Sequence, residues 1–208
     1  MIAIIDYGVG NLFSLKSSLS HIGAEAIVTN DTEVIRKADK IILPGVGAFG
    51  DAIEKLKSSG MADIVCDEAK KGKPILGICL GMQLLFEKSF EYGEYEGLGL
   101  IEGEIRPIKD DVAEGVKIPH MGWNSLSFGE KKNEIFKFLT DGDFVYFVHS
   151  FYGTKCKDST IATSEYGGAC ITAAVAKDNV YGCQFHPEKS GETGLSILKA
   201  FCEIGENK

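Results

Sequence analysis

Residues 74–86 read PILGICLGMQLLF and join a short apolar run to a helix-like segment through two glycines. The run at residues 74–78 predicts a buried strand, and residues 82–86 have the composition of a helix. A strand followed at once by a helix is typical of parallel sheets, because neighbouring parallel strands need a crossover connection between them. This stretch therefore predicts an α/β fold with Cys79 at a strand-to-helix turn.

The sequence on the N-terminal side repeats the same alternation. Apolar runs predict three further strands, at residues 2–5, 26–29 and 41–43. The segments between and after them predict helices at residues 12–22, near 31, at 51–58 and at 61–71. Such alternation is typical of βαβ units around a sheet that is buried on both faces.

The pattern changes after residue 92. Glycine-rich, short extended pieces continue to about residue 129 without a helical period. Beyond them we expect a helix at 134–139, strands at 144–148, 170–176 and 180–185, and a closing helix at 195–201. The sequence has no repeat or linker, so we predict one α/β domain over residues 1–208 with an antiparallel-rich second half.

The composition of the 208 residues disfavours several classes of protein. The net charge of −8 argues against binding to nucleic acid, which needs a basic face, and suits an enzyme with small substrates or a basic protein partner. No apolar run approaches the roughly 20 residues that cross a bilayer, and the N-terminus lacks an export signal, so we expect a cytoplasmic protein that binds no membrane. The six cysteines lack the paired spacing of zinc ligands, so we expect free thiols and no metal.

A glycine-rich loop follows the predicted strand at 41–43. Its sequence, Gly45-Val46-Gly47-Ala48-Phe49-Gly50, satisfies the GxGxxG pattern of dinucleotide-binding loops. That pattern normally follows the first strand, whereas this loop follows the third and begins behind Pro44, so nucleotide binding is disfavoured. Two alternatives stay open: a pair of tight turns, or a loop whose exposed backbone N–H groups serve an active site elsewhere.

Cys79 lies between Gly77 and Gly81 in the setting of a nucleophile elbow, with cysteine in place of serine. Such a turn leaves room only for small neighbours and raises the central side chain above the sheet. There it meets the positive end of a helix, which favours a thiolate. From this pattern alone, a buried cysteine at a tight turn explains the sequence as well as catalysis does.

His186 and Glu188 favour catalysis. They follow a strand-like run in Gln184-Phe185-His186-Pro187-Glu188, and residues two apart in an extended segment project from the same face. A carboxylate beside an imidazole fixes its tautomer and stabilises the cation that forms when it takes a proton. We therefore predict a triad of Cys79, His186 and Glu188, which requires the fold to bring the middle and the end of the chain together.

The motifs GICLGMQ and QFHPE resemble those of the class I (triad) glutamine amidotransferases. DYGVGN, PGVGAFG, PHMGWN, YFVHSF and HPEKS narrow the resemblance to one branch of that family, the glutaminase subunits of imidazole glycerol phosphate synthases in histidine biosynthesis. The matching motifs run from residue 6 to residue 190. The resemblance implies a flavodoxin-like, class I glutamine amidotransferase-like fold: a single three-layer domain with a mixed, mostly parallel sheet.

The resemblance also implies acyl transfer without a cofactor. Cys79 would attack the side-chain amide of glutamine to form a γ-glutamyl thioester, His186 would carry the proton, and Glu188 would orient His186. The oxyanion donors would be the N–H groups of Leu80 and Val46. The implied substrate-binding residues are Gly47, Gln83, His149, Ser150 and Phe151, the last of which stands where some relatives have tyrosine.

A partner subunit is implied as well. Ammonia is quickly protonated in water, so an enzyme that makes it for another reaction should keep it from solvent. Members of this branch dock on a (β/α)₈-barrel synthase subunit, where the ammonia yields imidazole glycerol phosphate and an aminoimidazole carboxamide ribonucleotide. The implied interface residues are Asn11, His120, Trp123, Tyr146 and Lys189, each of which also has a purely structural explanation, such as helix capping for Asn11.

Three other functions stay open. The chain could supply ammonia to a different synthase, such as one that amidates a sugar, with the same catalytic motifs. It could be a cysteine hydrolase for γ-glutamyl or peptide bonds that needs no partner, against which PHMGWN and HPEKS argue. It could be a binding module that has lost catalysis, against which the intact Cys79, His186 and Glu188 argue.

Overall fold

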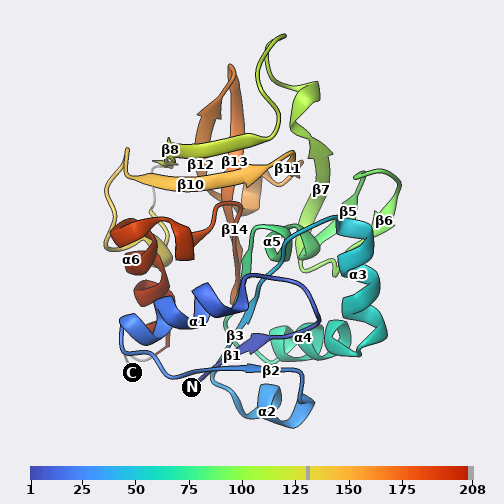
Figure 1. Cartoon of the computed structure of the whole chain (residues 1–208), viewed down its shortest axis with the longest axis vertical. Coiled ribbons are helices and arrows are strands. Elements are labelled where there is room, and N and C mark those ends of the chain that lie inside the picture. Colours follow the sequence, from blue (N-terminus) through green and yellow to red (C-terminus); the bar gives the residue numbers. More distant parts are fainter. Residues whose placement is uncertain (130–131, 206–208) are drawn as a thin grey trace.

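The computed structural model describes residues 1–129 and 132–205. Its main feature is an eight-stranded sheet, with two smaller sheets beyond one end of it (Figure 1). In order across the main sheet, the strands are β2 (Ala26–Thr29), β1 (Ile2–Ile5), β3 (Lys40–Leu43), β4 (Ile75–Ile78), β14 (Val180–Cys183), β13 (Ala169–Lys177), β12 (Thr160–Tyr166) and β9 (Ser127–Phe128).

The main sheet is mixed. Its first five strands are parallel, and the last three are antiparallel to their neighbours. Every residue of β1, β3, β4 and β14 is buried, as expected for parallel strands that are covered on both faces. The strands predicted from apolar runs in the first 78 residues are confirmed.

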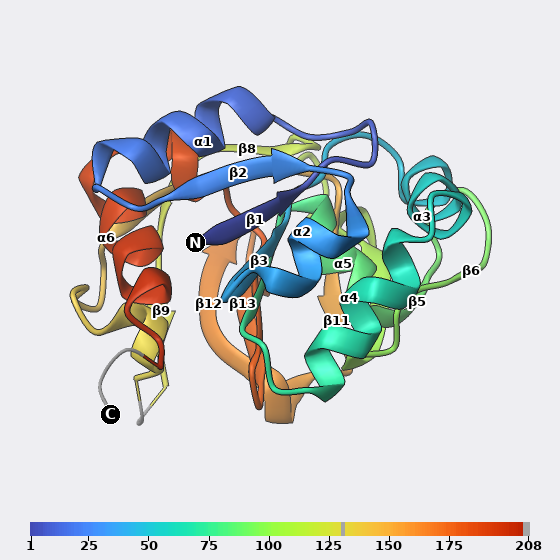
Figure 2. The same cartoon turned by 90° about the horizontal axis from the view of Figure 1, so that it is seen from below.

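Helices cover both faces of this sheet. The α-helices of the described residues are α1 (Leu12–His21), α2 (Thr32–Lys37), α3 (Phe49–Ser58), α4 (Met61–Lys70), α5 (Leu80–Leu84) and α6 (Gly191–Cys202). One core lies between the sheet and α1 with α6, and another lies between the sheet and α2, α3 and α4 (Figure 2). The chain is therefore a single α/β domain of three layers.

The two smaller sheets combine strands from residues 92–129, where the sequence indicated only short extended pieces, with the strand predicted at 144–148 and two strands that the sequence did not indicate. They consist of β10 (Phe144–His149) with β8 (His120–Ser125), and of β11 (Phe151–Thr154), β7 (Ile101–Pro107), β5 (Phe86–Ser89) and β6 (Tyr95–Glu96) in that order. The remaining regular segments are 3₁₀ turns: η1 (Ile108–Asp110), η2 (Glu134–Phe136), η3 (Lys157–Ser159) and η4 (Pro187–Lys189).

Two predicted helices differ from the observed ones. The helix expected at 134–139 is only the 3₁₀ turn η2, whose first residues are held by the Asn133 side chain accepting from the N–H of Ile135. Its apolar residues are buried against α6 without a helix, because tertiary packing overrides a segment too short to nucleate one. The helix expected at 82–86 begins at Leu80 and ends at Leu84, since Phe86 already belongs to β5.

The fold determines where a site can form. The carboxyl ends of β1, β3, β4 and β14 point to the same edge of the sheet, and ligands of open α/β sheets bind beyond that edge. The loops that follow these four strands carry the glycine-rich motifs, Cys79 and His186. No helix within residues 1–129 and 132–205 has the length and apolar character to cross a membrane.

Candidate active site

Cys79 occupies the turn between β4 and α5 with φ 53° and ψ −110°, a strained conformation for any residue other than glycine. Two glycines make the turn possible. A Cβ on Gly77 would lie 2.7 Å from the carbonyl oxygen of Gly81, and a Cβ on Gly81 would collide with the carbonyl oxygen of Leu43. The turn therefore has the strained strand-to-helix geometry that the sequence predicts there.

His186 reaches Cys79 because β4 and β14 are parallel neighbours. Ile78 pairs with Cys183, and the backbone N–H of Cys79 donates to the carbonyl of Cys183 at 2.7 Å. The two chain segments leave the sheet side by side, so Cys79 and His186 line one cavity of about 330 Å³. The structure thus brings together the sulfur and the imidazole that lie far apart in the sequence.

Glu188 completes the group. Its Oε1 lies 2.8 Å from Nδ1 of His186, so Nδ1 carries a proton and Nε2 is left for the sulfur. The pair does not form along an extended strand, as the sequence indicated, but across the 3₁₀ turn η4, which Pro187 begins. Among the described residues, Oε2 of Glu188 has no hydrogen-bond partner although it is buried.

The electrostatics of this group centre on His186. Burial lowers the pKa of its ring, but hydrogen bonds and charges from Cys79 and Glu188 outweigh burial and raise the pKa to about 9. The ring beside the sulfur therefore stays protonated near neutral pH. Such a pair is suited to attack on a carbonyl carbon followed by proton donation to a leaving group.

The glycine-rich loop of residues 44–48 packs directly against the nucleophile turn. A Cβ on Gly45 would lie 2.7 Å from the backbone nitrogen of Gly81, so only glycine allows this approach. Tyr7, which the sequence did not single out, donates its hydroxyl to the carbonyl of Pro44 at 2.8 Å, and burial raises its pKa. The loop places Val46 at the cavity wall that Leu80 also lines, where both expected oxyanion donors belong.

The five residues expected to bind glutamine all line this cavity: Gly47, Gln83, His149, Ser150 and Phe151. The amide nitrogen of Gln83 is, however, committed to the protein. It donates to the carbonyl of Phe151 and to Oε1 of Gln184, each at 3.0 Å. Contact of Gln83 with a substrate would therefore run through its oxygen.

Glu91 is an acid of the cavity wall that the sequence did not indicate. It is buried, and its carboxylate accepts from the N–H of Phe49 at the start of α3, at 2.8 Å. Burial raises its pKa, and the Phe49 N–H opposes that shift. Glu91 belongs to no motif, because its place in the site depends on the fold of the loop after β5.

The residues expected at an interface differ in their exposure and in their contacts. Trp123 is exposed and packs edge-on against Tyr146, whose backbone is bonded to the His186 segment. Lys189 lines the cavity, and Asn11 caps α1 by accepting from the N–H of Ser14 at 3.4 Å. The ring of His120, in contrast, is buried.

His120 is only 2% exposed, and its ring is stacked between those of Phe147 and Tyr166 at centroid distances of 4.6 and 3.9 Å. A ring in this position does not reach a docked subunit. If His120 affects an interface, it does so by holding the strand β8 in place and not by direct contact. In the described ranges, no three His, Cys, Asp or Glu side chains converge in a way that could hold a metal ion.

Comparison with known proteins is consistent with this geometry. A family model described as Glutamine amidotransferase class-I matches residues 3–204. The chain is 50% identical over 206 residues to the imidazole glycerol phosphate synthase subunit HisH of Wolinella succinogenes, covering 99% of this chain and 100% of the relative. It is 53% identical over 206 residues to the protein of the same name from Caldanaerobacter subterraneus subsp. tengcongensis, with 98% of each covered. A solved structure titled as that of a glutamine amidotransferase has a TM-score of 0.75 over 98% of both chains at 18% identity, a likeness of fold alone.

Proposed function

This chain belongs to the class-I glutamine amidotransferase family, and we propose from it that the chain is the glutaminase subunit of an imidazole glycerol phosphate synthase. It hydrolyses glutamine to glutamate and ammonia and passes the ammonia to a synthase subunit. The observation that carries the proposal is the meeting of Cys79, His186 and Glu188 at one cavity. Relatives named imidazole glycerol phosphate synthase subunit HisH are about half identical to this chain over nearly its whole length, which supports a role in histidine biosynthesis.

In the proposed mechanism, Sγ of Cys79 attacks the side-chain carbonyl carbon of glutamine. Nε2 of His186, which has already taken up the thiol proton before the attack, delivers it to the departing ammonia, leaving a γ-glutamyl thioester. The same ring then takes a proton from water, which attacks the thioester and releases glutamate. Glu188 holds Nδ1–H of the ring at 2.8 Å and balances its positive charge throughout.

The negative oxygen of each tetrahedral intermediate needs donors that are already in place. We assign this role to the backbone N–H groups of Leu80 and Val46. Leu80 is the first residue of α5, where the helix dipole adds to the donor, and Tyr7 anchors the loop before Val46 through the Pro44 carbonyl. Loss of one such donor costs about 10²–10³ in rate in other enzymes.

Glu91 provides a negatively charged group for glutamine recognition, which the sequence motifs did not indicate. Free glutamine carries an α-ammonium group, and a buried carboxylate in the cavity wall is a suitable partner for it. Burial raises the pKa of Glu91, and an ammonium beside it would reverse that shift and keep the group ionised. We therefore add Glu91 to the proposed substrate site with Gly47, Gln83, His149, Ser150 and Phe151.

The synthase subunit is proposed to dock over the cavity mouth. Val46, Met121 and Trp123 present exposed large apolar side chains; Val46 and Lys189 line the cavity, and Met121 pairs with Val148 of its wall. Exposed aromatic and methionine side chains are enriched in protein interfaces. We also propose that residues 1–208 act as one glutamine amidotransferase domain in the cytoplasm, where the (β/α)₈-barrel subunit would receive the ammonia.

Supply of ammonia to a sugar-amidating synthase is not favoured. The relatives at 50% and 53% identity cover almost the whole chain and carry the name of the imidazole glycerol phosphate synthase subunit. A hydrolase without a partner is not favoured for the same reason.

The experiment that tests the function is the Cys79→Ala variant in complex with the barrel subunit. Because the nucleophile is lost, glutamine-dependent formation of imidazole glycerol phosphate should fall by at least about 10⁴-fold. Added ammonium salt should still support the partner at the wild-type rate. Cys183→Ala, which removes a buried thiol from the neighbouring strand, is the matched control and should keep glutamine-dependent activity. Glutamine turnover by Cys79→Ala would contradict the assignment.

A further inference from the structure

Gln184 is a buried side chain to which neither the triad nor the substrate site assigns a role. It follows β14 directly, two residues before His186, and has no exposed surface. Its Nε2 lies 3.9 Å from Sγ of Cys79, and its Oε1 lies 3.0 Å from Nε2 of Gln83. The question is which end of this amide faces the sulfur, since an N–H and a carbonyl oxygen would have opposite effects there.

The carbonyl oxygen of Phe151 decides the orientation. A carbonyl oxygen only accepts, so the Gln83 atom 3.0 Å from it must be the NH₂ group. The same nitrogen lies 3.0 Å from the amide of Gln184, so the Gln184 atom on that side must be the oxygen. The NH₂ group of Gln184 is thereby left facing Cys79. Reversal of either amide would set two acceptors or two donors against each other.

A second buried chain of hydrogen bonds holds the same carbonyl. Nδ1 of His149 lies 2.8 Å from the Phe151 oxygen, so Nδ1 must carry the proton. Nε2 of His149 therefore accepts from Nδ1–H of His120 at 3.1 Å, and Nε2 of His120 faces the amide of Asn124 at 3.4 Å. Burial lowers the pKa of His149 to about 3 and that of His120 to about 4, so both rings stay neutral near pH 7.

We propose that Gln184 is a further catalytic residue, whose side-chain N–H donates to the sulfur of Cys79 and is held in that orientation by Gln83 and the Phe151 carbonyl. The sulfur also lies 4.0 Å from the carbonyl oxygen of Val148, which favours the thiol and opposes a negative charge. The Gln184 N–H offsets that effect, because a donor stabilises a charged acceptor more than a neutral one. The inference rests on the proposed function in one respect: Cys79 is taken as the nucleophile.

The test is the rate at which iodoacetamide alkylates Cys79 in the full chain at pH 7, followed by mass spectrometry of the peptide that carries it. Gln184→Met keeps a side chain of similar length but removes the donor. We expect alkylation to be about tenfold slower, the effect of one hydrogen bond to a charged group. In the complex, kcat for glutamine should fall by about the same factor, while KM changes by less than about twofold, because the donor acts on the sulfur and not on bound glutamine.

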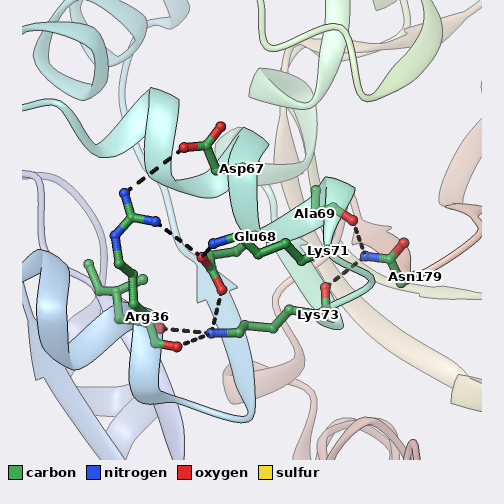
Figure 3. Close-up of polar contacts among 8 residues, drawn as sticks. Arg36, Asp67, Glu68, Ala69, Lys71, Lys73 and Asn179 are labelled. Carbon is green, nitrogen blue, oxygen red and sulfur yellow. Dashed lines mark hydrogen bonds and ion pairs between the residues drawn. The ribbon is translucent and has the colours of Figure 1, made fainter.

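Asn179→Leu is the matched control. Asn179 stands just before the other end of β14, where its amide donates to the carbonyls of Ala69 at 2.9 Å and Lys73 at 2.7 Å (Figure 3). This variant also loses a hydrogen-bonded amide next to the strand and should lower the melting temperature without slowing alkylation. A wild-type alkylation rate in Gln184→Met, or equal slowing in both variants, would overturn the proposal.

A second variant keeps the test decisive if Gln184→Met does not fold. Gln83→Met leaves Gln184 in place but removes the group that fixes its orientation, so alkylation should slow by about two- to fivefold, less than for loss of the donor itself. An unchanged rate would overturn the assigned orientation. Because alkylation needs no glutamine, these outcomes are separate from those of Cys79→Ala, whose retained glutamine turnover would refute the proposed function instead.

Discussion

Glu188 and Glu68 are two carboxylates that are buried to the same degree at opposite ends of the main sheet. Each side chain is 3% exposed. Glu68, on α4, is surrounded by cations: Nζ of Lys71 at 2.6 Å, Nζ of Lys73 at 2.7 Å and Nη1 of Arg36 at 3.5 Å (Figure 3). Glu188 bonds to His186 through one oxygen, and its other oxygen has no partner among the described residues.

The difference separates a structural acid from a reactive one. Burial alone would raise the pKa of Glu68, but hydrogen bonds and charges from Lys71 and Lys73 outweigh it and lower the pKa. Paired charges around Glu68 therefore stabilise its end of the sheet. The end that carries Cys79 has a strained backbone, a Glu188 oxygen without a partner among the described residues, and a raised pKa at His186. Strain and incomplete pairing of this kind are tolerated where function requires them.

Glu188→Gln should have the largest effect of the variants that compare these two regions. The amide oxygen can still accept from His186, but the charge that balances the imidazolium is lost. We expect kcat for glutamine hydrolysis in the complex to fall by about 10²–10⁴-fold. The free energy of unfolding should change by only about 1 kcal/mol, because the hydrogen bond is weakened and the ring can release its proton and need not remain an unpaired buried cation. Steady-state kinetics and urea unfolding measure the two effects, and a large loss of stability with normal kcat would remove the contrast.

Glu68→Gln should show the reverse. Removing a buried charge leaves its cations without their shared partner, which costs about 3–5 kcal/mol when the whole group is buried. Here the side chains of Lys71 and Arg36 are 59% and 39% exposed, so we expect a loss of about 2 kcal/mol in the free energy of unfolding. The kcat of the complex should stay within about twofold of wild type.

Lys71→Met is the control for Glu68→Gln. It removes one exposed partner while Lys73 and Arg36 remain, so the free energy of unfolding should fall by less than about 1 kcal/mol. A loss as large as that of Glu68→Gln would mean that one exposed ion pair, and not the buried carboxylate, stabilises this end of the sheet.

The two carboxylates should also differ in how the stability near them responds to pH. The pKa of His186 is raised from 6.5 to about 9, so the folded state keeps a proton that the unfolded state releases between these values. Its contribution to the free energy of unfolding is complete below pH 6.5 and is lost as pH rises toward 9, by at most about 1.4 kcal/mol per pH unit. Glu68 has its pKa lowered from 4.5, so its contribution is complete above pH 4.5 and is lost as pH falls below that value.

Urea unfolding across pH 3–10 (roughly) checks this prediction. The stability difference between wild type and Glu188→Gln should narrow on the alkaline side, and that between wild type and Glu68→Gln should narrow on the acid side. Narrowing of both differences in the same direction would show that the two carboxylates do not differ as their surroundings indicate.

Features with local causes were predictable from the sequence. The turn at Cys79 follows from steric exclusion at Gly77 and Gly81, and His186 and Glu188 make contact as predicted, although across the 3₁₀ turn η4 and not along a strand. The first four strands follow from short apolar runs between helices. The prediction of a helix at 134–139 was wrong. The apolar residues of this segment are buried against α6 by a single 3₁₀ turn, and no local pattern in the sequence reveals that packing.

Glu91, Tyr7 and Gln184 entered the site only through the fold. Tyr7 and Gln184 belong to the motifs DYGVGN and QFHPE, and Glu91 belongs to none, but no spacing in the sequence points from any of them to Cys79. Glu91 reaches the cavity through the loop after β5, and Gln184 reaches the sulfur because β14 runs beside β4. His120 shows the opposite case, since the resemblance implied an interface residue and the fold buries its ring.

The sequence by itself determined which groups can react: a cysteine in a strained turn and an imidazole paired with a carboxylate, because sterics and hydrogen bonding act over a few neighbouring residues. Only the tertiary structure decided that they meet, because the order of strands in a sheet depends on long-range pairing. The insertion of β14 between β4 and β13 sets His186 beside Cys79. The same pairing orients a buried amide toward the sulfur and leaves one carboxylate oxygen without a partner among the described residues.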